Sequence, residues 1–329
     1  MKIGIGVFPK EMSTSVASTV EMVKLAETMG FSDAWIPDSQ GLWKDPYVVL
    51  ALAAANTQSI KLGLGVTNPI TRHPMASARA ILTIHEVSQA RAIFGLGAGD
   101  TSLKALSSKP ATVVRCAEYI AAVRNLIDGK EATWEGIQQQ LRNIGGLPKI
   151  PIYVAANGPV MMRLAGQIAD GVIIPVGFTE EFVQYIFKHI DEGLAKAGRR
   201  REHIDVCFLA GCAVSGDRAA ARQQVKAYVA KRALVPVPSE ISGISADEKE
   251  RFIQAYRIED HLRVGARHAE LVPESWIDRF ALAGTSDDVV NKIAQLKDWG
   301  VRHLIVLPEV ADTASLIKMI GRDVIPKMS

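Results

Sequence analysis

The sequence predicts a (β/α)8 barrel, the α/β fold in which eight parallel strands alternate with helices. Short apolar runs alternate with amphipathic helical segments along most of the 329 residues, which is typical of parallel strands joined by helical crossovers. Hydrophobic residues make up 48% of the chain and charged residues only 22%, enough for one large core. Several apolar runs end abruptly in glycine and polar residues, as barrel strands do where they present backbone to a ligand.

Eight apolar runs have the length and composition of buried strands. They span residues 2–7, 33–37, 61–66, 92–97, 152–155, 171–175, 205–214 and 303–308. Helices are predicted at 16–29, which ends before Gly30, and at 75–87, where apolar residues recur on one side. A doubly wound open sheet is the alternative, because a strand count taken from sequence can err by one or two.

The interval between the seventh and eighth predicted strands is too long for a single crossover. Helices are predicted at 219–233 and 246–258, separated by a segment with two prolines that would interrupt any helix. We therefore expect a single domain over residues 1–329 with a helical insertion at about 215–275, above the barrel mouth. It would act as a lid or substrate-pocket wall, or serve packing or dimerisation. Residues 130–151 are predicted to form a loop or small hairpin.

Charge and motif content exclude several classes of protein. The formal net charge is only +3, and the densest basic run, Arg199 to Arg201, is typical of a solvated loop, so we expect no nucleic-acid partner. Neither a His-x-His nor an HExxH pattern is present, which disfavours a metal site. No lysine ends a predicted strand and no GxSxG elbow occurs, which argues against a Schiff-base aldolase and a serine hydrolase.

The cysteines and the first residues bear on the cellular compartment. Cys116, Cys207 and Cys212 show no CxxC spacing, and buried free thiols in a reducing cytoplasm are the simplest interpretation. The chain starts with a predicted strand rather than a signal peptide. No apolar stretch reaches the roughly eighteen residues of a membrane span. We expect a soluble cytoplasmic protein without a membrane partner.

Glycines end two of the predicted strands. Gly65 lies at the end of the third strand, and Gly95, Gly97 and Gly99 form a GxGxG pattern at the fourth. This pattern departs from the dinucleotide GxGxxG fingerprint in its last glycine. Glycine lets a flat ring lie directly on backbone, where a Cβ atom would keep it away; a tight turn without ligand is the alternative.

The fifth and sixth predicted strands lead into two adjacent loops. Pro159 suits the first position of a helix, so Asn157 and Gly158 would precede it and leave free N–H groups pointing outward. Val176 and Gly177 follow the next strand. Such adjacent loops commonly bind phosphate in barrels. The polar residues left at strand ends suit the holding of a cofactor, which would carry the difficult chemistry; they are Asp38, Ser39, Thr67, Asn68, Asp100 and Asn157.

Four motifs carry a resemblance to a known family. They are Gly65-Val-Thr-Asn-Pro with Arg72-His-Pro74, Gly95-Leu-Gly-Ala-Gly-Asp100, Ala155-Ala-Asn-Gly-Pro159 and Ala169-Asp-Gly171. The chain thereby resembles the bacterial-luciferase-like superfamily, most closely its methylenetetrahydromethanopterin reductase-like members, which use the deazaflavin coenzyme F420. The resemblance covers nearly the whole chain and is weakest in the insertion. It implies a homodimeric oxidoreductase that transfers a hydride between F420 and a small organic substrate.

Two other functions stay open beside this one. The first is an FMN-dependent monooxygenase or flavin reductase of the same superfamily, in which reduced flavin meets oxygen. The second is a noncatalytic flavin-binding protein that stores or carries the cofactor. Oxygen consumption during turnover would distinguish the monooxygenase, and a bound but unreactive ring would distinguish the carrier.

The resemblance also implies roles for individual residues. A non-proline cis peptide at Gly65–Val66 would lie under the ring of the cofactor. The further residues implied to contact the cofactor are Asp38, Thr67 and Asn68 near the ring, Gly97, Ala98 and Gly99 beside it, and Ala156, Asn157, Gly158, Val176 and Gly177 at the phosphate. Asp100 matches an acidic family residue and would position or protonate the substrate, unless it caps its loop. Trp43 would stack near the ring or line the substrate pocket, unless it packs on its own loop.

Two departures from the family bear on the substrate. Gly6 stands where the methanopterin reductases carry a glutamate, which puts methylenetetrahydromethanopterin in doubt as substrate. Ser39 stands at the catalytic-histidine position of F420-dependent glucose-6-phosphate dehydrogenases, so sugar-phosphate oxidation is not expected.

In the insertion, four basic residues would meet an anionic substrate or form a solvated helix face; they are His261, Arg263, Arg267 and His268.

Overall fold

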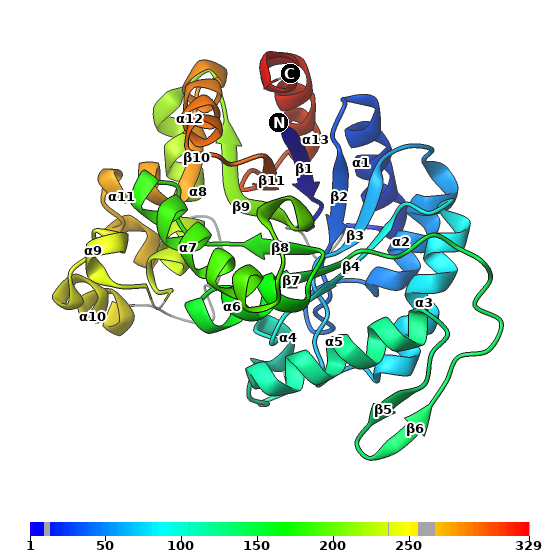
Figure 1. Ribbon diagram of the computed structural model, residues 1–329. Helices are drawn as coiled ribbons and strands as arrows, with labels where there is room; N and C mark the ends of the chain where they lie inside the picture. Colours follow the sequence, from blue (N-terminus) through cyan, green and yellow to red (C-terminus); the bar gives the residue numbers. More distant parts are fainter. Residues whose placement is uncertain (10–13, 105, 236, 256–266, 329) are drawn as a thin grey trace.

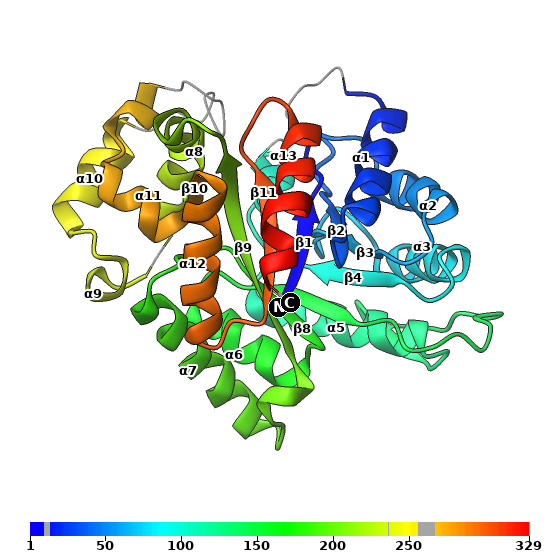
Figure 2. The same cartoon turned by 90° about the horizontal axis from the view of Figure 1, so that it is seen from above.

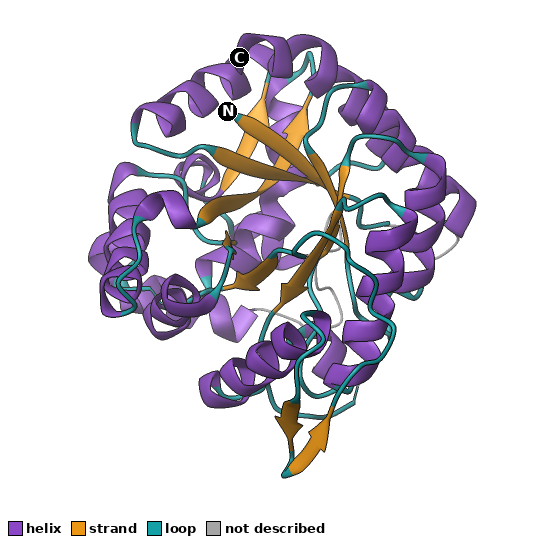
Figure 3. Ribbon diagram, turned by 45° about the vertical axis from the view of Figure 1, so that its right-hand side comes forward, coloured by secondary structure: helices purple, strands orange, loops and turns teal. Residues whose placement is uncertain are grey.

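Eight parallel strands close into a barrel surrounded by helices (Figures 1 and 3). The structure is a computed structural model that describes residues 1–9, 14–104, 106–235, 237–255 and 267–328. Around the barrel the strands are β1 (Lys2–Gly6), β2 (Asp33–Ile36), β3 (Lys61–Leu64), β4 (Ala92–Leu96), β7 (Ile152–Ala155), β8 (Gly171–Ile174), β9 (Asp205–Val214) and β11 (His303–Pro308), which pairs with β1. The (β/α)8 prediction is confirmed, and all eight predicted strands are present.

Helices cover the outside of the barrel. They are α1 (Val16–Thr28), α2 (Pro46–Asn56), α3 (Pro74–Val87), α4 (Thr101–Lys104), α5 (Val113–Ile127), α6 (Pro159–Ile168), α7 (Glu180–Lys196), α8 (Arg218–Ala233), α9 (Ser239–Ser242), α10 (Ala246–Ala255), α11 (Glu274–Phe280), α12 (Ser286–Asp298) and α13 (Thr313–Met319). The helices predicted at 16–29, 75–87 and 219–233 correspond to α1, α3 and α8. The helix predicted at 246–258 corresponds to α10, and its last three residues lie outside the described ranges. No helix in the described part of the chain is long and apolar enough to cross a membrane.

Two hydrophobic cores hold the barrel together. The larger lies between the helices and the outer face of the strands. The smaller fills the barrel interior with Trp35, Ile93, Tyr153, Ile173, Cys207 and Ile305. Gly63 makes room for the largest of these side chains, since a Cβ atom there would lie 2.3 Å from the Trp35 ring. Because interior side chains fill the barrel, a ligand site is confined to its ends.

A buried polar network closes the amino-terminal end of the barrel. The His303 imidazole lies 2.8 Å from Asp33 Oδ2 through Nε2 and 3.0 Å from Asp205 Oδ2 through Nδ1. Lys2 donates a hydrogen bond to Asp205 from outside. Burial alone would lower the pKa of His303, but the neighbouring thiol and carboxylates raise it well above its usual value. The network therefore holds an imidazolium between two carboxylates.

Three short strands lie outside the eight. The segment 130–151 contains the antiparallel hairpin of β5 (Ala132–Trp134) and β6 (Ile137–Gln139), which projects from the barrel (Figure 1) and agrees with the predicted loop or hairpin. The strand β10 (Ala281–Gly284) was not predicted. It pairs with the last residues of β9, beyond the stretch of β9 that pairs with β8. The two termini lie side by side (Figure 2), and the amino group of Met1 donates to the carbonyl of Met328.

Candidate functional site

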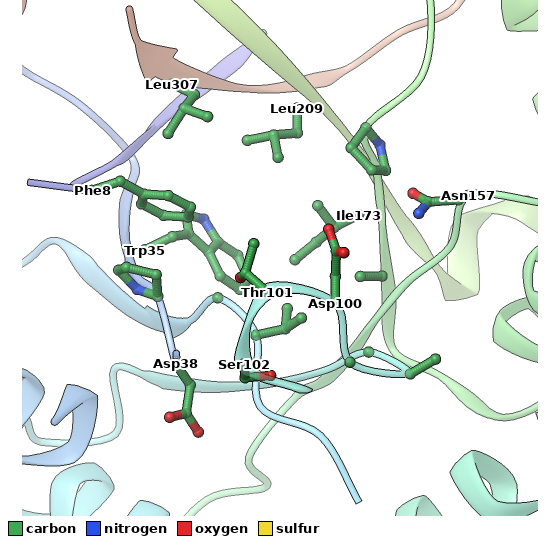
Figure 4. Close-up of a pocket in the computed structure, with 18 of the residues that line it drawn as sticks. Phe8, Trp35, Asp38, Asp100, Thr101, Ser102, Asn157, Ile173, Leu209 and Leu307 are labelled. Atoms are coloured by element: carbon green, nitrogen blue, oxygen red, sulfur yellow. The ribbon is translucent and has the colours of Figure 1, made fainter. Parts of the chain in front are cut away.

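A cavity of about 360 Å³ opens at the carboxyl ends of the barrel strands (Figure 4). Its floor rests on the inner core, against which Val66, Ala155 and Leu209 pack. Phe8, Trp35 and Leu307 form one side, and Asp100 and Asn157 lie together on another. A mostly apolar cavity with a few polar groups converging on it is the usual form of a small-molecule site.

The third and fourth strands bring their backbone to this cavity. The peptide bond Gly65–Val66 is cis, which confirms the expectation for this bond. Gly65, Val66 and the backbone of Gly97 to Gly99 all line the cavity. Gly95 lies below them and lets β4 approach β3, because a Cβ atom at Gly95 would lie 2.0 Å from the Leu64 carbonyl oxygen. Glycine therefore leaves a flat backbone surface on this side of the cavity, where a planar ring fits.

Asp38 lines the cavity with its charge already paired. Its carboxylate accepts two hydrogen bonds from Arg72, from Nε to Oδ2 at 2.8 Å and from Nη2 to Oδ1 at 3.2 Å. Arg72 also donates to Asp45, the N-cap of α2. A buried carboxylate in a bidentate pair with arginine is held rigidly. Ser39 is buried beside it and lines a small neighbouring pocket rather than the main cavity.

Trp43 reaches the cavity from the loop after β2. Its indole Nε1 donates to the Pro9 carbonyl at 3.1 Å, and its ring lies 5.4 Å from that of Phe8. Both rings line the cavity. The interpretation of Trp43 as part of a pocket wall therefore agrees with its position, and its hydrogen bond fixes the ring across the loop after β1.

Thr67 and Asn68 lie behind the cavity instead of on its surface. Both are buried, and neither belongs to the lining. The Asn68 amide donates to Thr71 Oγ1 and Ser102 Oγ, and its carbonyl oxygen accepts two backbone N–H groups. Asn68 thus ties the loop after β3 to α4, and Ser102 of α4 does line the cavity. A side chain with all these bonds acts as a support for the cavity wall.

Of the two loops expected to bind phosphate, the loop after β7 lines the cavity with two of its predicted residues, whereas the loop after β8 reaches it only through Pro175. Asn157 and Gly158 line it, and Gly158 is the N-cap of α6 with no side-chain hydrogen bond of its own. The first backbone N–H groups of α6 are therefore not capped by a side chain, as at helix ends that bind anions. Ala156, Val176 and Gly177 are buried behind this surface and do not line the cavity.

Asp100 lies in a cluster of charges. Its carboxylate is 2.9 Å from Lys104 Nζ and 3.0 Å from Lys231 Nζ. Burial would raise the pKa of Asp100, but the charge of Lys231 and hydrogen bonds from both lysines lower it well below its usual value. Asp100 is therefore ionised at neutral pH. It is placed to hold a group in position, and it has no proton to give.

Lys231, its neighbour Arg232 and Tyr228 line the cavity from α8 and were not among the residues singled out from sequence. Burial and the Arg232 charge lower the pKa of Lys231 to about 8. Arg232 donates to the Pro175 carbonyl at 2.8 Å, and its guanidinium carbon lies 5.2 Å from the centre of the Tyr228 ring. A sequence signal was present: residues i, i+3 and i+4 of a helix share one face, and these three follow that spacing.

Gly6 lies beneath the apolar side of the cavity. A Cβ atom there would lie 3.0 Å from Leu307 Cδ1 and 3.2 Å from the Phe8 ring. A longer side chain at position 6 would thus displace two residues that line the cavity. Where the resemblance to the methanopterin reductases implies a glutamate, this chain therefore has a glycine packed against apolar side chains.

The structure thus brings ten of the predicted residues to one cavity. These are Asp38, Trp43, Gly65, Val66, Gly97, Ala98, Gly99, Asp100, Asn157 and Gly158. Among the basic residues of the insertion, His261 and Arg263 lie outside the described ranges. Arg267 and His268 belong to the short helix Arg267–Leu271.

Comparison with known proteins places this arrangement in a family. The family model described as luciferase-like monooxygenase matches residues 1–303. A 5,10-methylenetetrahydromethanopterin reductase of Archaeoglobus fulgidus is 35% identical over 320 residues, covering 93% of this chain and 94% of that protein. An F420-dependent glucose-6-phosphate dehydrogenase of Microbacterium testaceum is 27% identical over 322 residues, covering 92% and 91%. The solved coenzyme F420 dependent tetrahydromethanopterin reductase of Methanopyrus kandleri superposes with a TM-score of 0.86 at 29% identity, covering 100% and 99%.

Proposed function

Since the chain belongs to the luciferase-like monooxygenase family, we propose that it is an oxidoreductase that uses coenzyme F420 to transfer a hydride to or from a small organic substrate. Relatives along the whole chain are named as reductases and dehydrogenases that depend on F420, which supports the function expected from the motifs. When bound, F420 supplies the hydride-transferring carbon of its deazaflavin ring.

The observation that carries the proposal is the glycine-lined backbone on one side of the cavity. The cis peptide Gly65–Val66 and the segment Gly97–Gly99 lie next to each other at the ends of β3 and β4. Side chains are absent at the glycines, so a planar ring fits there, above a floor of Val66 and Ala155. The uncapped start of α6 at Gly158 lies in the same cavity and suits a phosphate.

The remaining cofactor and catalytic assignments follow from this placement. Asp38, fixed by Arg72, and Ala98 would flank the ring, while Asn157 would help the α6 N–H groups to hold the phosphate. Thr67, Asn68, Ala156, Val176 and Gly177 would support these contacts from behind. Trp43 would shield the ring from water. Ser39 was also a candidate catalytic residue, but it lines the adjacent pocket and not this cavity.

Asp100 and Lys231 divide the proton chemistry between them. Asp100 stays ionised because of its two lysine partners, so its role is to orient the ammonium group of Lys231. Lys231, whose pKa is lowered to about 8, holds a proton at neutral pH and can release one in the range where enzymes operate. The apolar side formed by Phe8, Trp35 and Leu307 excludes water from the same space.

The function is tested by titrating the purified protein with F420 and, separately, with FMN in the absence of oxygen, following ring absorbance and fluorescence. We expect F420 to bind far more tightly than FMN. A preference for FMN would instead indicate the monooxygenase or flavin-reductase function. Tight F420 binding with no turnover over a broad substrate panel would indicate a carrier.

Four further properties belong to this proposal. The protein would be a homodimer, as the resemblance implies, and would act on small molecules without a nucleic-acid partner. Residues 1–329 would form one domain, in which the segment 215–275 is the insertion. The three free cysteines are all buried, which supports a reducing cytoplasmic location.

A further inference from the structure

Lys231 and Arg232 form a cationic wall on the α8 side of the cavity. The proposed function gives Lys231 a transferable proton but gives the two positive charges no ligand. We propose that this wall binds a carboxylate or phosphate group of the substrate, so that the substrate is a small organic anion. The inference rests on the proposed function, because it assigns the part of the same cavity that the cofactor leaves.

Arg232 has the properties of a preformed anion ligand. Its side chain is only 9% exposed, yet it lines the cavity. Nη1 is fixed by the Pro175 carbonyl, and Nε is itself buried and has no hydrogen-bond partner within the described ranges, so an anion in the cavity would meet the part of the guanidinium that lines it. A buried guanidinium with an unpaired donor is costly unless an acceptor completes it. A planar guanidinium also matches the geometry of carboxylate and phosphate oxygens.

Lys231 holds the second charge beside it. Its side chain is 20% exposed, and Nζ lies 3.0 Å from Asp100 Oδ2. Asp100 is itself about half exposed and has a second partner, Lys104 Nζ, at 2.9 Å. An anion arriving at Lys231 can therefore displace the Asp100 carboxylate, which retains Lys104. Lys104 and Lys231 share this one carboxylate, and the charge of Arg232 lies beside Lys231. Among these four described residues the cations outnumber the carboxylate, which leaves net positive charge at this side of the cavity.

The wall and the cis peptide follow strands that stand on opposite sides of the barrel. In the closed order β1, β2, β3, β4, β7, β8, β9, β11, the strand β9 stands directly across the barrel from β3. The helix α8 follows β9, while the cis peptide Gly65–Val66 follows β3. Lys231 reaches across the mouth to Asp100, which directly follows Gly99, so a ring held on the backbone after β3 and β4 would lie beside Lys231 and Arg232. A molecule between them would have its anionic group on α8 and its reacting carbon toward the ring.

The test measures sulfate binding to the F420-loaded protein by calorimetry at constant ionic strength. Sulfate is the probe because its charge does not change between pH 6 and 10. We expect sulfate to bind while F420 stays bound, and Lys231→Gln or Arg232→Gln to weaken that binding about tenfold or more, the value of one charged hydrogen bond. Lys24→Gln is the matched control, because it makes the same change at a partly exposed lysine of α1 that does not line the cavity. Lys231→Arg should restore binding.

Raising the pH provides a second readout. Among the described residues, the charges that act on Lys231 include those of Asp100, Lys104 and Arg232. Because the pKa of Lys231 is lowered to about 8, its positive charge is lost as the pH rises through 8. Sulfate affinity should fall there in the wild type and stay flat in Lys231→Gln. Circular dichroism and urea unfolding check each variant, and the partly exposed Lys231→Gln decides the question if Arg232→Gln does not fold.

The affinity for F420 and for FO, the deazaflavin chromophore without the phosphate, is measured in every variant. Unchanged affinity for both supports an anion site for the substrate. Weaker binding of F420 with unchanged binding of FO would show that the wall serves the cofactor phosphate and would overturn the inference, as would absent sulfate binding. If the wild type binds no F420, the proposed function fails. Sulfate binding to the apoprotein then still tests whether Lys231 and Arg232 bind an anion.

Discussion

His303 places a positive charge between Asp33 and Asp205 at the base of the barrel, far from the cavity at the other end. A pKa raised above the unfolded value of about 6.5 means that the contribution of His303 to stability is complete below that pH and is lost as pH rises through the folded pKa. The pKa values of Asp33 and Asp205 are lowered by the imidazolium despite their burial. Their contribution is present above about pH 3.9 and is lost in acid.

We therefore predict that stability is highest between about pH 4 and 6.5 and declines on both sides. Replacing His303 by Gln should cost about 3–5 kcal/mol, because the buried Asp33 loses its cation and Asp205 keeps only Lys2, and should abolish the decline above pH 6.5. Urea unfolding at pH 5, 7 and 9 measures both effects, with the exposed His203→Gln as control. A stability of the wild type that does not change from pH 6.5 to 9 would contradict the charge assignment.

The outer face of α2 carries two apolar side chains that no described residue covers fully. Val48 is 55% exposed and Leu52, one turn further on, is 44% exposed. Side chains four residues apart on a helix lie on the same face, and exposed apolar surface on a barrel helix suits a symmetric contact with a second copy. This face is where we place the interface of the proposed homodimer.

Sedimentation velocity at micromolar concentration should accordingly show a dimer for the wild type. The double variant Val48→Glu, Leu52→Glu should sediment as a monomer with unchanged circular dichroism, because two buried unpaired charges would oppose association. Val160→Glu, at an equally exposed position of α6, serves as the control. A wild type that is monomeric, or a double variant that remains dimeric, would rule out this interface.

The periodicity of the sequence was sufficient to predict the barrel strands and several of the helices. Apolar runs bounded by glycine and polar residues predicted all eight barrel strands, since a strand buried on both faces has a distinctive composition. The strand β10 was missed because its four residues, Ala281–Gly284, include two alanines and a glycine and have little strand propensity. It forms only because β8 ends and leaves the last part of β9 unpaired.

Residues at strand ends were predictable, and residues brought in by a helix were not. Gly65, Gly97 and Asp100 could be identified because a barrel strand always delivers its carboxyl end to the site. The orientation of α8 depends on a tertiary contact: the Tyr228 ring fills the space above Gly211, where a Cβ atom would lie 2.4 Å from it. That contact turns Lys231 and Arg232 toward the cavity. Asn68 was expected at the ring edge, and local hydrogen bonds turn its side chain away.

The molecule as a whole brings the backbone after β3 and β4 and the cationic side chains of α8 to one barrel mouth, above a filled interior. The walls and floor of the cavity thus come from segments that are distant in sequence, and the closed order of the strands fixes their positions. We infer that F420 binds in this cavity and on no other surface of the molecule.

The most direct test is the affinity for F420 of a variant whose cavity is filled from the floor. Ala155 packs on the inner core and lines the cavity, so Ala155→Phe should occupy space that the ring needs and weaken F420 binding by about a hundredfold or more, as expected for a steric block in a preformed site. Val114→Phe, at an exposed position, should bind F420 as the wild type does. Wild-type affinity in a folded Ala155→Phe protein would contradict the placement of the cofactor in this cavity.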